Sequence, residues 1–148
     1  MNILAVDTST DVCSVAVLQG ASVLAELSLD EHRQHTERIL ALIEQALGRA
    51  GIAACALDCI AVATGPGMFT GLRVGISTAQ GLALSLGTPL IGVSSLAVIA
   101  RQAGSAEWIC PMLDARRGQV YTCLYHRTAD ERLDQTEPDT VIEPAAWA

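Results

Sequence analysis

Short apolar runs separated by polar turns open the chain. Residues 3–6 are apolar, apolar and polar positions alternate over 12–18, and a third apolar-rich run covers 23–29. A period of two residues is typical of strands that bury one face. The pattern predicts three consecutive strands, of which the first two form a hairpin.

Helical spacing then replaces this alternation. From Thr36 to Ala50 the apolar positions recur every three or four residues, and Gly51 is a suitable helix end. A second helix is expected from Thr70 to Leu86, where a glycine follows.

Two further apolar runs, 59–64 and 90–93, predict strands on either side of the second helix, and Ser94 is placed to cap a third helix through residue 103. Three strands are thus followed by helix, strand, helix, strand and helix. This order predicts an α/β fold whose mixed sheet has an antiparallel edge and parallel crossovers.

A new strand–turn–strand pattern begins after residue 104. Strands are expected at 108–113 and 119–125, on either side of a turn that starts at Asp114. Because this arrangement resembles the opening hairpin, we predict a first lobe over 1–104 and the start of a second, incomplete lobe over 105–148. The polar, acidic stretch from 127 to 144 is expected to form loops.

Composition narrows the possible functions. The 148 residues carry a net charge of −7 and include arginine but no lysine. This excludes a P-loop lysine and Schiff-base chemistry, and it disfavours tight binding of the isolated chain to a nucleic-acid backbone. Five cysteines without a C-x-x-C pair indicate buried thiols in a reducing compartment. With no signal-peptide pattern and no uninterrupted apolar span, a cytoplasmic protein is expected.

A glycine-rich loop, Gly65–Gly71, joins the strand at 59–64 to the second predicted helix. Its backbone N–H groups could meet an anion. Its spacing departs from the dinucleotide-binding pattern, however, and no acidic residue occurs from 59 to 106. A tight turn that lets the helix pack closely is the alternative.

Small residues then recur every four positions along the second helix, at Gly71, Gly75, Ala79 and Ala83. Such a ridge allows another element to approach the helix closely. It suits packing within the fold and contact with a second protein equally. We predict a subunit interface, so that Gly75→Leu would weaken association more than folding.

Three polar clusters are candidate sites. Asp7, Thr8 and Ser9 end the first strand like a degenerate phosphate loop, although the next acid, Asp11, disfavours phosphate and little or no nucleotide hydrolysis is expected. A polar hairpin turn is the alternative.

The other two clusters are weaker still. His32 and His35 could ligate a metal, but their spacing ahead of a helix provides no fixed geometry, so none is expected. Arg116 and Arg117, after Asp114, predict a surface turn, with an anion or an acidic partner group as the alternative contact. No local signature indicates a catalytic nucleophile.

Four segments resemble the TsaB (YeaZ) family: 3–10, 35–39, 65–75 and 113–121. The run GPGMFTGLRVG at 65–75 is the most specific, and the resemblance covers essentially the whole chain. Met68 stands where the family usually has serine, which argues against a hydroxyl binding phosphate there. The family's second lobe normally continues past residue 148.

The resemblance implies an actin-like (ribonuclease-H-like) fold with a degenerate nucleotide site, where a nucleotide is the only cofactor left open. Family members pair with the catalytic homologue TsaD and the ATPase TsaE in synthesis of tRNA threonylcarbamoyladenosine, and they self-pair when TsaD is absent. A non-catalytic subunit that meets tRNA only through the complex is therefore expected. By analogy the first two helices form the partner surface, with the expected contacts Ile39, Ile43, Phe69, Gly71, Leu72, Arg73, Gly75, Ile76, Ala79 and Ala83.

Two other classes stay open. An ATP-binding kinase or ATPase of the same superfold would need a competent phosphate loop, and ATP turnover by the pure chain would identify it. A glycoprotease-like metallohydrolase would need a metal or nucleophile site, and bound zinc or iron would identify that class.

Overall fold

The computed structural model describes residues 1–30 and 35–146, in two compact units. The first unit comprises Met1–Thr64 and Met68–Val93, and the second comprises Gly65–Gly67 and Ser94–Ala148. The structure therefore groups the third helix with the second unit, whereas the sequence pattern had placed it in the first lobe.

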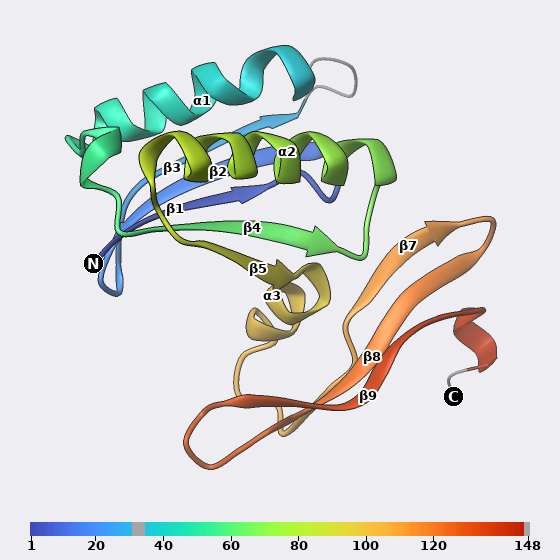
Figure 1. The fold of residues 1–148 in the computed structure, drawn as a ribbon. Helices are drawn as coiled ribbons and strands as arrows, with labels where there is room; N and C mark the ends of the chain where they lie inside the picture. The colour runs from blue at the N-terminus through green and yellow to red at the C-terminus, as the bar shows by residue number, and fades with distance from the viewer. Residues whose placement is uncertain (31–34, 147–148) are drawn as a thin grey trace. The chain divides into compact units, whose positions relative to one another are not determined.

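The sheet of the first unit has five strands in the order β3-β2-β1-β4-β5 (Figure 1). β1 pairs antiparallel with β2 and parallel with β4, and β2 pairs antiparallel with β3. The sheet is thus mixed with an antiparallel edge, as the pattern predicts. The strands are β1 (Asn2–Asp7), β2 (Val12–Gln19), β3 (Ser22–Asp30), β4 (Cys59–Gly65) and β5 (Leu90–Ser94).

Alternating burial gives this sheet one strongly apolar face. The register places Leu4 opposite Val17 and Val6 opposite Val15, and all four side chains are buried. Since successive residues of a strand point to opposite faces, these four lie on the same side.

Two helices, α1 (His35–Ala50) and α2 (Phe69–Leu86), cover that face (Figure 1). Both begin within one residue of the predicted position and end where predicted. Gly87 ends α2 in the left-handed conformation, with φ 65°, and its N–H donates to the Ala83 carbonyl oxygen. A short 3-10 turn, η1 (Ala54–Ala56), follows α1.

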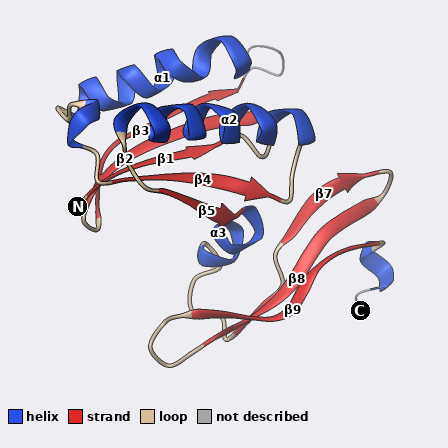
Figure 2. Ribbon diagram, in the orientation of Figure 1, coloured by secondary structure: helices blue, strands red, loops and turns tan. Residues whose placement is uncertain are grey.

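The second unit packs the short helix α3 on a second sheet (Figure 2). Its strands run in the order β6-β8-β7, and β9 pairs with β8. Ser94 caps α3 as predicted, because its Oγ accepts a hydrogen bond from Ala97 N at 3.4 Å. The elements are α3 (Ser95–Arg101), β6 (Trp108–Ile109), β7 (Met112–Arg116), β8 (Gln119–Arg127), β9 (Leu133–Ile142) and η2 (Pro144–Ala146).

Two predictions for this unit are wrong. The stretch expected to form loops contains β9, which pairs along β8. β9 is mostly exposed, so its polar sequence lacks apolar alternation, and its Pro138 suits an edge strand. The strand expected over 108–113 is divided into β6 and β7 at Cys110 and Pro111, because proline has no N–H to donate to a strand ladder.

The thiols are distributed largely as predicted. Cys13, Cys59 and Cys123 are buried, whereas Cys55 is exposed in η1. Within residues 1–30 and 35–146, no helix is both long enough and apolar enough to cross a membrane.

Candidate partner surface

The turn after β1 is folded in on itself. The Asp7 carboxylate accepts a hydrogen bond from Ser9 N at 2.8 Å, and both Thr8 and Ser9 are almost fully buried. The three residues predicted as a degenerate phosphate loop therefore lie together, with two of their side chains turned away from solvent.

Helix α2 lies directly on this turn. Thr8 Oγ1 donates to the Gly71 carbonyl oxygen at 2.8 Å, and Met68 N donates to the Ser9 carbonyl oxygen at 2.7 Å. A Cβ atom at Gly71 would overlap the Thr8 carbonyl oxygen, and one at Gly75 would overlap Thr8 Oγ1. The missing side chains allow this approach, and the Thr8 hydroxyl is engaged within the protein.

The small-residue ridge of α2 is consequently interior. The close approach that the ridge allows occurs within the first unit, whereas a subunit interface at α2 stays a prediction. Two isoleucines of α1 are buried in the same core. The members of the expected contact set that are buried in this way are Ile39, Ile43, Gly71, Gly75, Ala79 and Ala83.

The rest of the expected contact set lies on other sides of α2. Phe69 is 73% exposed, and the Arg73 guanidinium carbon lies 5.4 Å from the centre of its ring, within range of a cation–π contact. Leu72 and Ile76 of the same helix are half-buried. The exposed side of α2 therefore combines an aromatic ring with a cation.

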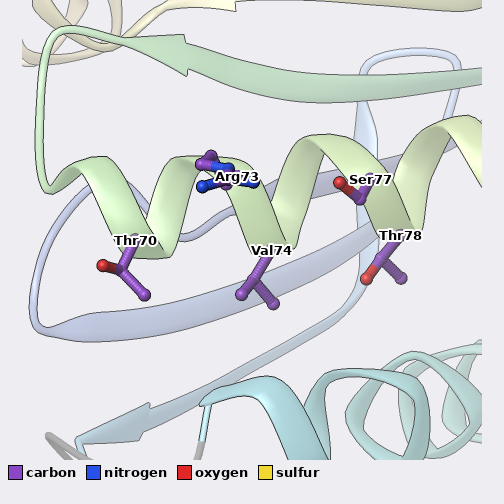
Figure 3. A pocket seen from close by; sticks show the side chains of 5 residues that line it. All are labelled: Thr70, Arg73, Val74, Ser77 and Thr78. Atoms are coloured by element: carbon purple, nitrogen blue, oxygen red, sulfur yellow. The ribbon is translucent and has the colours of Figure 1, made fainter.

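A shallow hollow of about 360 Å³ follows the same helix (Figure 3). Three of its side chains end in hydroxyl groups and one is cationic. All the lining residues that the structure describes come from α2. The lining residues are Thr70, Arg73, Val74, Ser77 and Thr78.

Large apolar side chains are also exposed along the helical layer. Leu84, near the end of α2, is 86% exposed, and Leu40 on α1 is 53% exposed. Sequence reasoning missed both leucines, since helical spacing alone assigns them to the apolar face.

Burial suppresses the chemistry of two thiols. Burial, with a smaller contribution from the negative charge of Asp7, raises the pKa of Cys13. Burial likewise raises the pKa of Cys123 to about 11. Since the thiolate is the nucleophile, the raised pKa disfavours nucleophilic reaction of both cysteines at neutral pH.

Among the described residues, no group of three or more His, Cys, Asp or Glu side chains is placed to hold a metal ion. Of the two predicted metal-ligand candidates, His32 and the side chain of His35 both lie outside the described part of the chain.

Sequence comparison identifies relatives of the whole chain. The family model described as TsaD, tRNA N6-adenosine threonylcarbamoyltransferase, matches residues 22–148. The tRNA threonylcarbamoyladenosine biosynthesis protein TsaB of Escherichia coli strain K12 is 40% identical over 147 residues, which are 97% of this chain and 63% of that protein. The Bacillus subtilis protein of the same name is 38% identical over 148 residues, 99% of this chain and 64% of that protein.

Solved structures agree with the sequence relatives. YeaZ from Pseudomonas aeruginosa matches with a TM-score of 0.87 and 37% identity, over 97% of this chain and 68% of that one. The ROK hexokinase of Thermus thermophilus matches with a TM-score of 0.54 at 15% identity, over 88% and 50% of the two chains. The second likeness shows the fold alone, which is the actin-like fold.

The chain spans 63% and 64% of the length of the two curated relatives. Its identity with those proteins extends over nearly all of its own length, and its fold matches that of a solved family member. The chain belongs to the TsaB (YeaZ) family.

Proposed function

We propose that the chain is a non-catalytic subunit in the synthesis of tRNA threonylcarbamoyladenosine. In this proposal it supports a TsaD-like catalytic subunit, and a TsaE-like ATPase completes the complex. The exposed side of α2 carries the proposal, because Phe69 and Leu84 leave large apolar surfaces in water. The proposed role in tRNA threonylcarbamoyladenosine synthesis is taken from the names of the two curated relatives.

The chemistry of that surface suits a protein partner. Aromatic and arginine side chains are enriched at the centres of interfaces, where they supply most of the binding energy. Phe69 and Arg73 already contact one another, so little side-chain freedom would be lost on association. The hydroxyls of Thr70 and Ser77 can satisfy polar groups around this pair.

Two observations support a non-catalytic role. The Thr8 hydroxyl donates to Gly71, and its side chain is buried, so it is engaged away from any phosphate. The net charge of −7 disfavours direct retention of tRNA, which fits contact with tRNA through the complex. In the absence of a TsaD-like subunit the same surface would serve self-association.

The test is binding of the chain to a TsaD homologue from the same source. Phe69→Ala and Leu84→Ser should each weaken binding about tenfold or more, as expected for central interface residues. Val23→Ser is the matched control, because Val23 is 56% exposed on β3 of the same unit. All three variants should unfold at the same denaturant concentration as the parent, because each removes an exposed side chain.

Equal binding by the parent and both helix variants would refute the proposed surface. Calorimetry with ATP and magnesium separates the main alternative, since micromolar binding with turnover would indicate a kinase or ATPase. Stoichiometric zinc or iron in the purified chain would indicate the metallohydrolase class.

A further inference from the structure

An arginine pair at the tip of the β7–β8 hairpin occupies an unfavourable backbone conformation. Arg116 has φ 69°, Arg117 has φ 56°, and Gly118 has φ 75°. Arg116 pairs with Gln119, so residues 117 and 118 form a two-residue loop. Such loops require positive φ at both positions and favour Asn-Gly or Gly-Gly. An arginine side chain is disfavoured there because its Cβ crowds the backbone.

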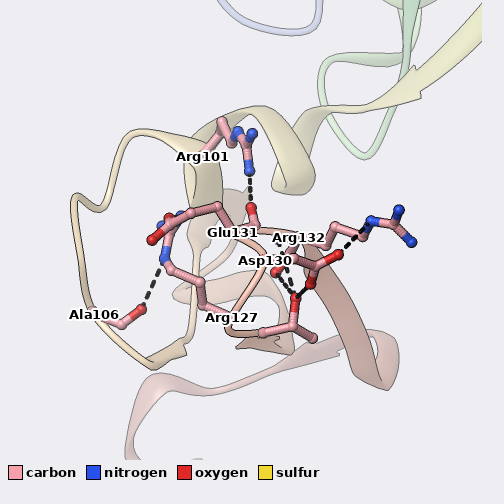
Figure 4. A network of polar contacts seen from close by, with 7 residues as sticks. Arg101, Ala106, Arg127, Asp130, Glu131 and Arg132 are labelled. Carbon is pink, nitrogen blue, oxygen red and sulfur yellow. Dashed lines mark hydrogen bonds and ion pairs between the residues drawn. The ribbon is translucent and has the colours of Figure 1, made fainter.

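At the turn between β8 and β9, a residue with the same positive φ makes contacts that stabilise the fold (Figure 4). Glu131 has φ 64°, and its carbonyl oxygen accepts from Arg101 Nη1 at 2.6 Å. Its carboxylate meets Arg127 Nη1 at 3.1 Å. Glu131 thus ties its turn to α3 and to β8.

Arg117 has no comparable use in the fold. It is exposed, and its guanidinium makes no hydrogen bond or ion pair with any residue in the described ranges. Residues that are held in disfavoured backbone conformations, and that make no stabilising contact within the fold, are concentrated at functional sites. The side chain of Arg117 is therefore the reason to look for a ligand at this tip.

We infer that the tip of the β7–β8 hairpin contacts phosphate groups of tRNA held by the complex, an inference that rests on the proposed function. Guanidinium groups bind phosphate oxygens through two parallel hydrogen bonds, and adjacent arginines can engage successive phosphates. Asp114 Oδ1 accepts from Arg116 N at 2.7 Å, which fixes the backbone at the base of the tip. With this aspartate included, the tip carries a charge of +1 in a chain of net charge −7.

The surroundings of the pair favour a phosphate backbone over an acidic protein. Residues 116–119 are all exposed and include no apolar side chain. A stable protein interface buries about 800 Å² on each side around an apolar centre, which a bare two-residue tip cannot supply. Contacts to nucleic-acid phosphates need only hydrated cations in the right place.

The experiment measures tRNA affinity of the complex assembled with TsaD and TsaE homologues at two salt concentrations. One phosphate contact makes affinity fall about 3.5-fold more between 50 and 200 mM salt, and two contacts about tenfold more. Arg117→Asn should make the fall in tRNA affinity between the two salt concentrations about 3.5-fold smaller. The Arg116→Gln, Arg117→Asn double variant should make that fall about tenfold smaller. Arg132→Asn is the control, because Arg132 is an exposed arginine at the turn between β8 and β9 and pairs with Asp130.

Arg117→Asn also separates binding from folding. Asparagine tolerates positive φ better than arginine, so this variant should unfold no earlier than the parent chain. Weaker tRNA binding with undiminished stability and normal assembly supports the inference. Earlier unfolding would overturn the argument from backbone conformation.

Three other outcomes overturn it as well. Parent and Arg117 variants with the same affinity and the same salt dependence exclude a phosphate contact. Normal tRNA binding with weakened assembly assigns the pair to an acidic protein surface instead. If the parent chain does not assemble with the TsaD homologue, the proposed function fails first and this inference falls with it.

Discussion

Gly75→Ala tests whether close packing between α2 and the β1–β2 turn holds the first unit together. In an exposed helix the change would stabilise by about 1 kcal/mol, because alanine is the better helix former. Here the new methyl group would overlap Thr8 Oγ1 and lie 3.4 Å from Thr8 Cβ. Rotating the threonine to relieve this overlap would break the buried hydrogen bond that Thr8 Oγ1 donates to the Gly71 carbonyl oxygen.

The expected result is a net destabilisation of about 1–3 kcal/mol, the usual cost of overpacking a core. Urea unfolding followed by far-ultraviolet circular dichroism measures it through the linear dependence of the unfolding free energy on denaturant. Gly81→Ala is the matched control on the same helix, since no atom lies within 4 Å of its added Cβ. That variant should be stabilised.

A double-mutant cycle identifies the cause. Thr8→Ala alone loses the buried hydrogen bond to Gly71, at a cost of about 1–3 kcal/mol. In the Thr8→Ala, Gly75→Ala double variant the overlap with the threonine is gone, so the two costs should be less than additive by about 1 kcal/mol or more. Strict additivity, or a Gly75→Ala variant as stable as Gly81→Ala, would refute the packing argument.

Three predictions concern the second unit. Thr122 is fully buried and its Oγ1 donates to the Pro111 carbonyl oxygen at 2.9 Å, so Thr122→Val should lower the unfolding free energy by about 1–3 kcal/mol in urea titrations, whereas Thr122→Ser should be milder. Burial raises the pKa of Cys123 from 9.0 to about 11, so the folded chain keeps a proton that the unfolded chain releases. The unfolding free energy should fall as pH rises from about 9 to 11. Denaturant unfolding measured at each pH should show a smaller fall for Cys123→Ala than for the parent chain. Ser94→Ala should cost about 1 kcal/mol through loss of the α3 cap, and unchanged hydrogen exchange at Ala97 would contradict it.

The elements with regular periodicity could be predicted from the sequence. β1, β2, β4, α1 and α2 bury residues at regular spacing, so their apolar spacing reports their structure directly. β9 could not be predicted, because an edge strand with six consecutive exposed residues leaves no apolar pattern. Its pairing with β8 is set by backbone hydrogen bonds, which any non-proline residue can make.

For the partner surface, the sequence pattern could not predict which side of α2 is buried and which is exposed. A four-residue spacing places Gly71 and Gly75 on one side of a helix, but it cannot tell whether the element that approaches is internal or external. The deciding contact is with Thr8, a residue 63 positions away from Gly71. Exposure is equally invisible in the pattern, since Leu84 looks like a core residue until the fold turns it outward.

The two proposed contacts lie in different units, so they should be energetically independent. Phe69 belongs to the first unit and Arg117 to the second, and neither argument depends on how the units are arranged. Phe69→Ala should weaken assembly without changing the salt dependence of tRNA binding once the complex is saturated. Arg117→Asn should leave assembly unchanged and reduce the salt dependence of tRNA binding. Effects of mutations at sites without shared partners usually add within about 0.5 kcal/mol. A double variant whose assembly defect exceeds that of Phe69→Ala would show that the arginine also contacts the protein partner, and the separation argued here would fail.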